Sequence, residues 1–356
     1  MLSESALGFL TRLLDTPGPS GFEGPAARVW RDEARAFAGD VTGDVHGNSS
    51  AVVNPEGSPT IMLAGHIDEI GLIVTYIDEQ GFVYVAPIGG WDPQVIVGQR
   101  IRFMGISGDV FGVVGKKPIH LIKGEEREKA AKLVDLWVDI GATSRDAAQQ
   151  MLRVGDAGVI DTRLLQMPNN RIASRSIDDR IGAFVVLEAL RRYAAQPGAA
   201  RVVAVATTQE EIGYMGGGAL PGANRINPAM AIAVDVTFAT DSPGIEKKEV
   251  GECTLGGGPV FARGSVISPV VFDLLVDAAR RLNVPYAVRA TGKNTSTDAD
   301  AIHIAREGVA TALVGIPNRY MHSPNEMVSL DDVHRTADVI AEACRAVSPA
   351  TDFAAR

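Results

Sequence analysis

This chain of 356 residues has few cysteines, no long apolar run and no excess of positive charge. Each of these properties argues against a class of protein. The two cysteines, Cys253 and Cys344, are too few for a disulfide framework. No apolar run approaches the roughly 20 residues that a helix needs to cross a bilayer. The N-terminus also lacks the basic and apolar regions of a secretory signal peptide. We therefore expect a cytoplasmic protein with no membrane partner.

Net charge and missing catalytic signatures narrow the function further. Aspartate and glutamate (43) outnumber lysine and arginine (34), and the net charge of −9 argues against a nucleic-acid partner, because basic surfaces dominate affinity for phosphates. The chain has no Gly-x-Ser-x-Gly motif, and neither cysteine lies in a nucleophile signature. The segment Gly115-Lys116-Lys117 lacks the upstream glycine and the hydroxyl residue of a phosphate-binding loop. Serine hydrolases, cysteine hydrolases and loop-type nucleotide sites are thereby disfavoured.

The hydrophobic pattern divides the chain into an α/β part and a β-rich insert. Apolar strands alternate with amphipathic helices in residues 1–69 and 165–356, whereas short β-like runs separated by glycines fill residues 70–164. We expect an α/β catalytic domain with a central, mostly parallel or mixed sheet flanked by helices, interrupted by a small inserted β-barrel domain. Helices are expected at 4–14, 24–37, 179–194, 268–282, 298–307 and 330–347, and strands outside the insert at 41–53 (a hairpin), 60–64, 201–207, 229–235, 284–289 and 310–315.

Two adjacent glutamates, Glu210 and Glu211, follow an apolar run that reads as a buried strand. Like charges at the end of a buried strand repel each other, so either a positive charge lies nearby or one carboxyl holds a proton. A metal ion would supply the positive charge. Its other ligands should then follow neighbouring strands, because sites in open α/β sheets collect at the carboxyl ends of strands.

Side chains of the kind that ligate metals stand at several other element ends. They are His66, Asp68, Asp178, Asp179, Asp235 and His322. Each one alone has a structural explanation, such as a helix N-cap for an aspartate or a loop position for a histidine. Of the aspartate pair, we expect Asp178 to point into the cleft and Asp179 to lie in the first helical turn. Together, histidines and carboxylates in this number are the ligand set of a two-metal hydrolytic site.

Five motifs, in chain order, resemble the metal-site motifs of the M42 family, the dinuclear aminopeptidases of the TET type. Members are also called deblocking or glutamyl aminopeptidases, and some have been named endoglucanase M. The motifs are Gly65–Gly71 (GHIDEIG), Ser176–Gly182 (SIDDRIG), Thr208–Gly213 (TQEEIG), Ala233–Asp235 (AVD) and Arg319–Pro324 (RYMHSP). Weaker matches are Gly18–Glu23 (GPSGFE), Gly89–Asp92 (GGWD) and Thr297–Ala299 (TDA). One departure is that Ser296 and Asp300 stand where smaller residues, often glycine, are expected.

The resemblance implies a metal-dependent aminopeptidase that removes N-terminal amino acids from peptides with a free N-terminus. Two divalent ions per subunit, Zn, Co or Mn, would activate a shared water. The implied roles are a bridging carboxylate for Asp178, ligands of one metal for His66 and Asp235, ligands of the other for Glu211 and His322, the general base for Glu210, and the orientation of His66 for Asp68. Adjacent residues of an extended segment face opposite sides, which would separate the tasks of the two glutamates.

By the same resemblance, the insert is a PDZ-like dimerisation domain, and dimers assemble into a tetrahedral dodecamer that admits peptides. Four aromatic residues of the insert are expected in its own core, the usual place of such side chains. They are Trp91, Phe103, Phe111 and Trp137. His120 is either a residue that reaches a neighbour's active site or an ordinary surface histidine.

Three other functions stay open. A dinuclear deacylase acting on N-acyl amino acids would share this site. A glycosidase would need two carboxyls flanking a sugar and no histidines. A metal-binding scaffold without activity would leave Glu210 unexplained. Within the aminopeptidase reading, a neutral aliphatic N-terminal residue such as leucine is the favoured substrate, and Asp298 and Asp300 indicate polarity near the site.

Overall fold

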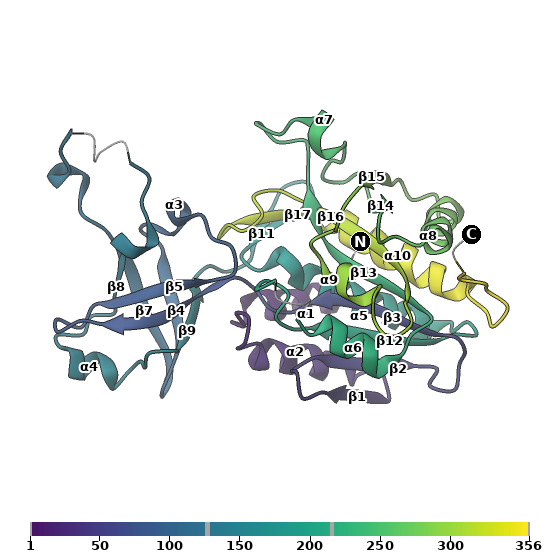
Figure 1. The fold of residues 1–356 in the computed structure, drawn as a ribbon, viewed down its shortest axis with the longest axis horizontal. Coiled ribbons are helices and arrows are strands. Elements are labelled where there is room, and N and C mark those ends of the chain that lie inside the picture. The colour runs from purple at the N-terminus through teal and green to yellow at the C-terminus, as the bar shows by residue number, and fades with distance from the viewer. Residues whose placement is uncertain (1, 125–128, 214–216, 355–356) are drawn as a thin grey trace.

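The computed structural model describes residues 2–124, 129–213 and 217–354. It combines a large mixed sheet, with helices on both sides, and a closed β-barrel that lies to one side of it (Figure 1). The predicted fold class is therefore confirmed. In barrel order, the barrel strands are β4 (Gly71–Ile77), β5 (Val83–Ile88), β8 (Trp137–Asp139), β7 (Gly108–Gly115), β6 (Arg100–Gly105) and β9 (Ala157–Ile160). None of the described helices is long and apolar enough to cross a membrane.

The large sheet brings the carboxyl ends of several strands to one edge. In spatial order its strands are β1 (Asp40–Gly43), β2 (Ser49–Val53), β12 (Arg201–Thr207), β3 (Thr60–His66), β13 (Met230–Phe238), β16 (Ala310–Asn318), β14 (Val260–Gly264) and β15 (Ala287–Thr291). Strand β3 runs parallel to both of its neighbours, β12 and β13, and β13 runs parallel to β16. Residues that follow these strands therefore share one end of the sheet.

Alternation along the strands sends side chains into two cores, one on each face of the sheet. Along β3, Ile61 and Leu63 join the larger core, whereas Met62 and Ala64 join the smaller one. Over the larger core lie α1 (Glu4–Asp15), α2 (Gly24–Ala34), α5 (Ile177–Ala195), α8 (Pro269–Arg281) and α10 (Leu330–Ala346). Over the smaller core lie α6 (Ala219–Ile226) and α9 (Asp298–Ile302).

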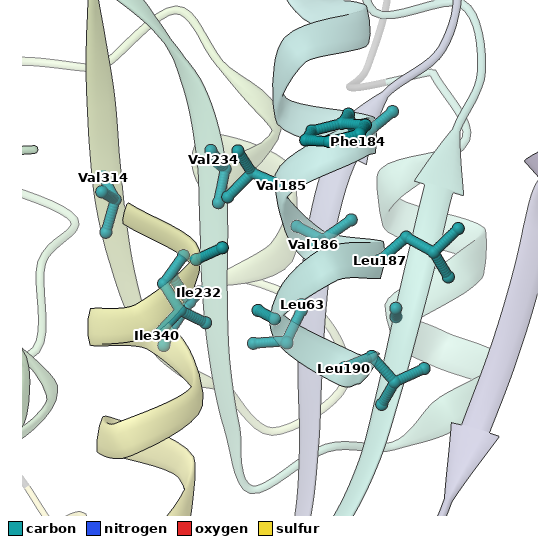
Figure 2. Close-up of a cluster of buried hydrophobic side chains, with 14 of the residues drawn as sticks. Leu63, Phe184, Val185, Val186, Leu187, Leu190, Ile232, Val234, Val314 and Ile340 are labelled. Atoms are coloured by element: carbon teal, nitrogen blue, oxygen red, sulfur yellow. The ribbon is translucent and has the colours of Figure 1, made fainter. Parts of the chain in front are cut away.

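Helix α5 is the central element of the larger core. Figure 2 shows its apolar side chains packed against strands β3 and β13 and against α10. Close approach at the start of the helix depends on glycine, because a Cβ built on Gly65 would lie 2.4 Å from the carbonyl carbon of Gly182. This contact places the first residues of α5 directly beside the end of β3.

The remaining described elements are short. A small sheet joins β10 (Leu165–Met167), β11 (Arg171–Ser174) and β17 (Glu326–Ser329), while short helices occur at α3 (Pro93–Ile96), α4 (Arg145–Gln149) and α7 (Lys247–Val250), with 3-10 turns at Ile119–Leu121 and Leu133–Asp135. Strand β17 matters for the site because it follows the loop that carries His322.

Several predicted bounds and one predicted burial differ from the structure. Helix α2 ends at Ala34 instead of residue 37, and strands β13 and β16 each end three residues later than expected. Helix α9 ends at Ile302 instead of residue 307, because the chain then turns and Arg306 has a left-handed φ of 50°. Strand β15 begins three residues later than expected. Phe111 is 56% exposed instead of buried in the barrel, whereas Phe103 is fully buried. On β7 the inward positions are Val110, Gly112 and Val114, so strand alternation sends Phe111 outward.

Candidate metal centre

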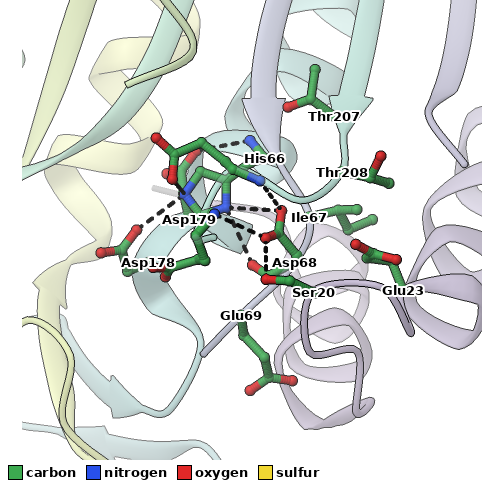
Figure 3. A network of polar contacts seen from close by, with 12 residues as sticks. Ser20, Glu23, His66, Ile67, Asp68, Glu69, Asp178, Asp179, Thr207 and Thr208 are labelled. Atoms are coloured by element: carbon green, nitrogen blue, oxygen red, sulfur yellow. Dashed lines mark hydrogen bonds and ion pairs between the residues drawn. The ribbon is translucent and has the colours of Figure 1, made fainter. Parts of the chain in front are cut away.

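The candidate ligands meet at the carboxyl edge of the large sheet. His66 is the last residue of β3 and pairs in register with Thr207, the last residue of β12. Glu210 and Glu211 follow β12, and Asp235 lies on β13, the other neighbour of β3. Asp178 lies at the start of α5, which the glycine contact holds against β3 (Figure 3).

Asp178 lies between the two histidines. One of its carboxylate oxygens, Oδ1, is 3.3 Å from Nε2 of His66, and the other, Oδ2, is 3.3 Å from Nε2 of His322. The adjacent glutamates face different histidines. Glu210 Oε2 lies 3.7 Å from His66 Nε2, and Glu211 Oε2 lies 3.3 Å from His322 Nε2.

Among the residues that the structure describes, two groups of ligand atoms are compact enough to hold a metal ion. His66, Asp178 and Glu211 form one group, and His66, Asp179 and Asp235 form the other, with the atoms of each group within 4.8 Å of one another. We predicted that Asp179 lies in an ordinary first helical turn, and the structure differs from this prediction. The backbone angles of Asp179 are non-helical, and its Oδ1 accepts a hydrogen bond from the Gly182 N–H at 3.0 Å in the manner of an N-cap.

Asp68 determines which nitrogen of His66 faces the cluster. His66 Nδ1 lies 3.2 Å from the Asp68 backbone carbonyl oxygen and 3.5 Å from its Oδ1. A carbonyl oxygen only accepts hydrogen bonds, so Nδ1 carries the proton when this bond forms. Nε2 is then left as the nitrogen that faces Asp178, in the manner of an orienting carboxylate beside a metal-bound histidine.

Asp68 also holds the two glutamates, a contact that the sequence did not suggest. Its carboxylate accepts from the backbone N–H of Glu210 at 3.2 Å and of Glu211 at 3.1 Å, and from Ser20 Oγ at 2.7 Å. Burial would raise the pKa of Asp68, but the bonds to His66, Ser20 and Glu211 outweigh burial and lower the pKa. Asp68 is therefore a fixed negative charge that positions both sides of the site.

Further supporting residues escaped the sequence analysis. Glu326 accepts hydrogen bonds from the backbone N–H of Asp178 and of His322, both at 2.8 Å. Glu69 pairs with Arg175 and, at 2.8 Å, with Arg180. These arginines flank Asp178 in the sequence. The signal that could have indicated the ion pairs is that Glu69 lies in the motif of His66, whereas the arginines lie in or beside the motif of Asp178. Glu326 had no such signal beyond its place four residues after His322.

The carboxyl groups of the cluster divide into one with a lowered pKa and several with raised pKa values. Burial would raise the pKa of Asp178, but its bonds to His322 and His66 outweigh burial and lower it. Burial, together with the charges of Asp235, Asp298 and Glu211, raises the pKa of Glu210 to about 10. Burial, together with the charge of Asp178, raises the pKa of Glu211 to about 6 and that of Asp235 well above its usual value. These upward shifts share two causes, which are burial of the carboxyl group and the negative charges of neighbouring carboxylates.

The residues present fit divalent cations. In the described part of the chain, Glu211 Oε1 is buried and has no hydrogen-bond partner. Oxygen and imidazole ligands without thiolate suit Zn, Co or Mn. A cation near Glu211 would satisfy the orphaned oxygen and offset the excess negative charge.

A cleft of about 870 Å³ opens from the cluster toward strands β14 and β15. Its lining includes the acidic and histidine side chains just described, apolar side chains such as Phe238 and Val260, and the cationic side chain of Arg289. The cleft can therefore hold a ligand that reaches from the cluster to Arg289.

The chain is similar to known proteins over most of its length. Residues 47–339 match the family described as M42 glutamyl aminopeptidase. The lysyl aminopeptidase of Pyrococcus furiosus is 37% identical over 332 residues, which cover 92% of this chain and 93% of that relative. A TET aminopeptidase from a marine-sediment Thaumarchaeota archaeon has a TM-score of 0.91 at 31% identity, with 97% of each chain covered. The TET1 peptidase of Pyrococcus horikoshii, which can assemble into a tetrahedron or a large octahedral shell, has a TM-score of 0.84 at 27% identity, with 96% of this chain and 100% of that chain covered.

Proposed function

Because the chain belongs to the M42 glutamyl aminopeptidase family, we propose that it is a metal-dependent aminopeptidase acting on peptides with a free N-terminus. The observation that carries this proposal is the placement of Asp178 between His66 and His322, with one carboxylate oxygen 3.3 Å from each imidazole. A carboxylate placed in this way is suited to bridging two metal ions. A cytoplasmic location stays a prediction.

The proposed ligands divide around Asp178. His66 and Asp235 would hold one cation, and Glu211 and His322 the other, while Asp178 contributes to both. When bound, divalent cations would supply the positive charge that these carboxylates lack, lower the pKa of water and stabilise an oxyanion. Asp68 keeps Nε2 of His66 directed at the cluster through its bond to Nδ1.

Glu210 is the proposed general base. It faces His66 at 3.7 Å, which leaves its carboxylate free to reach the cleft, and its side chain is 17% exposed against 5% for Glu211. In its ionised form, Glu210 would accept a proton from the water that attacks the peptide carbonyl. It would then return this proton to the amine that leaves when the C–N bond breaks.

Removal of metal tests the proposed activity against its alternatives. Dialysis against a chelator is expected to abolish hydrolysis of aminoacyl chromogenic substrates, and addition of Zn, Co or Mn is expected to restore it, because the ligand atoms alone cannot activate water. The rate is measured on substrates with free and with blocked amines. Cleavage of only the blocked substrates would favour a deacylase, and chelator-resistant hydrolysis of a β-glucan would favour a glycosidase.

We propose that the insert, residues 70–164, is the dimerisation domain and that dimers form a dodecamer. Its outer surface exposes large apolar side chains, among them Tyr76, Phe111 and Val113. Phe111 and Val113 are two residues apart on β7 and therefore share its outer face, and neighbouring exposed apolar side chains are typical of an interface. The assembly of the horikoshii relative into closed shells supports the proposal.

Light scattering of the purified chain is expected to give a mass of about 450 kDa, twelve times the 37.6 kDa subunit, or that of a dimer. Phe111→Asp is expected to shift the mass toward the monomer, because the substitution puts a charge into the apolar surface of the barrel. Val45→Asp is the control, since Val45 is fully exposed on the α/β part. A fully active monomeric wild type would contradict the assembly.

We further propose that the residue removed carries a carboxylate, in place of the neutral aliphatic residue that we first expected. Arg289 lines the cleft, donates a hydrogen bond to Thr237 Oγ1 and has its guanidinium 5.8 Å from the centroid of the Phe238 ring. Within residues 2–124, 129–213 and 217–354, no carboxylate lies within 4.0 Å of Arg289. A partly enclosed guanidinium without a counter-charge favours an anionic ligand.

The position of Arg289 relative to the cluster supports this choice. Its partner Thr237 lies two residues beyond Asp235 on β13, a distance of roughly 7 Å along a strand. An acidic side chain can extend over that distance from a peptide held at the cluster. Of the other cations that line the cleft, Lys247 pairs with Glu252 and Lys248 with Glu246, whereas Lys293 is exposed to solvent and less enclosed than Arg289.

A further inference from the structure

The loop that carries His322 lies outside the large sheet and has an unusual backbone. Tyr320 and His322 have left-handed φ values of 64° and 57°, which few residues other than glycine adopt. His66, by contrast, is the last residue of a central strand. The direction of the His322 imidazole therefore depends on contacts that hold its loop.

Two of these contacts come from the barrel part of the chain. The Gly90 carbonyl oxygen, just after β5, lies 2.8 Å from His322 Nδ1. The Thr162 hydroxyl, just after β9, donates to the Pro324 carbonyl oxygen at 3.3 Å. The insert thus contacts the His322 loop at two residues, His322 and Pro324.

The Gly90 contact determines the tautomer of His322. Because a carbonyl oxygen only accepts, His322 donates through Nδ1–H, and Nε2 becomes the nitrogen with a free lone pair. That nitrogen lies 3.3 Å from both Asp178 Oδ2 and Glu211 Oε2. Asp68 orients His66 in the same way, but from two residues away along the chain, whereas Gly90 is 232 residues from His322.

Close packing explains why two glycines occupy this turn. A Cβ on Gly90 would lie 3.2 Å from His322 Nδ1. Gly89 has a left-handed φ of 73°, and a Cβ there would lie 2.6 Å from Cγ2 of Ile70. The Trp91 indole N–H donates to the Gly71 carbonyl oxygen at 2.8 Å and ties the turn to the first barrel strand.

We propose that the Gly89–Gly90 turn of the insert is a positioning element of the metal centre, which holds Nε2 of His322 toward Asp178 and Glu211. The barrel then contributes to metal binding as well as to any assembly. This inference rests on the proposed function, in which His322 is a metal ligand.

Metal affinity of the whole chain tests the inference. Gly90→Ala is expected to weaken one of two bound Co²⁺ equivalents about 10- to 100-fold, the effect typical of lost outer contacts to a metal ligand, and to change the visible spectrum of that equivalent. Gly90 does not have a left-handed φ and is exposed, so alanine adds only the displacing methyl group. Thr162→Val, which removes the second contact, is expected to weaken the same equivalent by a smaller factor.

Gly112→Ala is the matched control. Its Cβ would lie 2.6 Å from Val138 Cγ1 inside the barrel, away from His322. It is expected to lower the melting temperature and leave both Co²⁺ affinities unchanged. A wild-type Co²⁺ affinity in Gly90→Ala, or an equal loss of Co²⁺ affinity in Gly112→Ala, would overturn this inference and leave the proposed function standing. Failure of the wild type to bind any divalent metal would overturn the proposed function and this inference with it.

Discussion

Replacement of Glu210 by glutamine is expected to leave metal content at the wild-type level and to lower kcat by about 10²- to 10⁴-fold, the usual contribution of a general base. The amide has the size of the carboxylate but cannot accept the proton of the attacking water. Metal binding should persist because the Glu210 side chain does not hold Glu211 or His322 in place. These two residues approach each other to 3.3 Å on the other side of Asp178.

Asp178→Asn is the informative contrast to this variant. Asp178 places one oxygen beside each histidine, and an amide can offer only one oxygen to the same two positions. Asp178→Asn is therefore expected to lose metal and activity together. Metal content by mass spectrometry and kcat are measured on both variants. A purified Glu210→Gln enzyme with near-normal turnover would refute the role of Glu210.

Charge reversal at Arg289 is expected to reverse the substrate preference. In the wild type, kcat/KM for an N-terminal glutamate should exceed that for lysine, and in Arg289→Glu the order should invert. Hydrogen bonds to charged groups contribute about 1.5–3 kcal/mol, so each substrate should change by about 10- to 100-fold. The comparisons leave this preference open, since the family description names glutamyl and the furiosus relative is a lysyl enzyme.

Arg263→Glu provides the control for charge reversal. Arg263 is exposed on the neighbouring strand β14, where its guanidinium lies 5.3 Å from the Phe272 ring and outside the lining of the cleft. The two variants change the net charge equally. A glutamate-to-lysine ratio that stays at the wild-type value in Arg289→Glu, or that shifts as much in Arg263→Glu, would contradict a carboxylate subsite at Arg289.

The hydrophobic pattern predicted the architecture because it is local. A strand with both faces buried reads as an apolar run, and the parallel strands β3, β12 and β13 all do so. The switch to short runs separated by glycines marked the barrel. The pattern did not separate inner from outer positions on β7, so Phe111 was misplaced, because a single aromatic residue does not reveal which face of a barrel it occupies.

Sequence motifs also predicted most of the candidate cluster, since its members follow strands that end at one edge of the sheet. They offered an N-cap role for an aspartate of the Asp178–Asp179 pair, but they did not predict Glu326 as the acceptor for two backbone N–H groups. The role of Glu326 depends on its contact with Asp178, which lies 148 residues away. No local periodicity records such a contact.

The sequence by itself determined the chemical inventory of this protein. It specified histidines and carboxylates at strand ends, an excess of buried negative charge and a barrel inserted between the first ligands and the others. Only the tertiary structure decided which atoms face one another. The tautomer of His322 is set by a carbonyl oxygen just after β5 of the barrel. Arg289, which has no carboxylate partner among the described residues, is held beside the cleft by its bond to Thr237. Hydrogen bonds of this kind depend on the register and packing of segments that are distant in the sequence. The type of a single residue does not reveal which distant segment will pack against it.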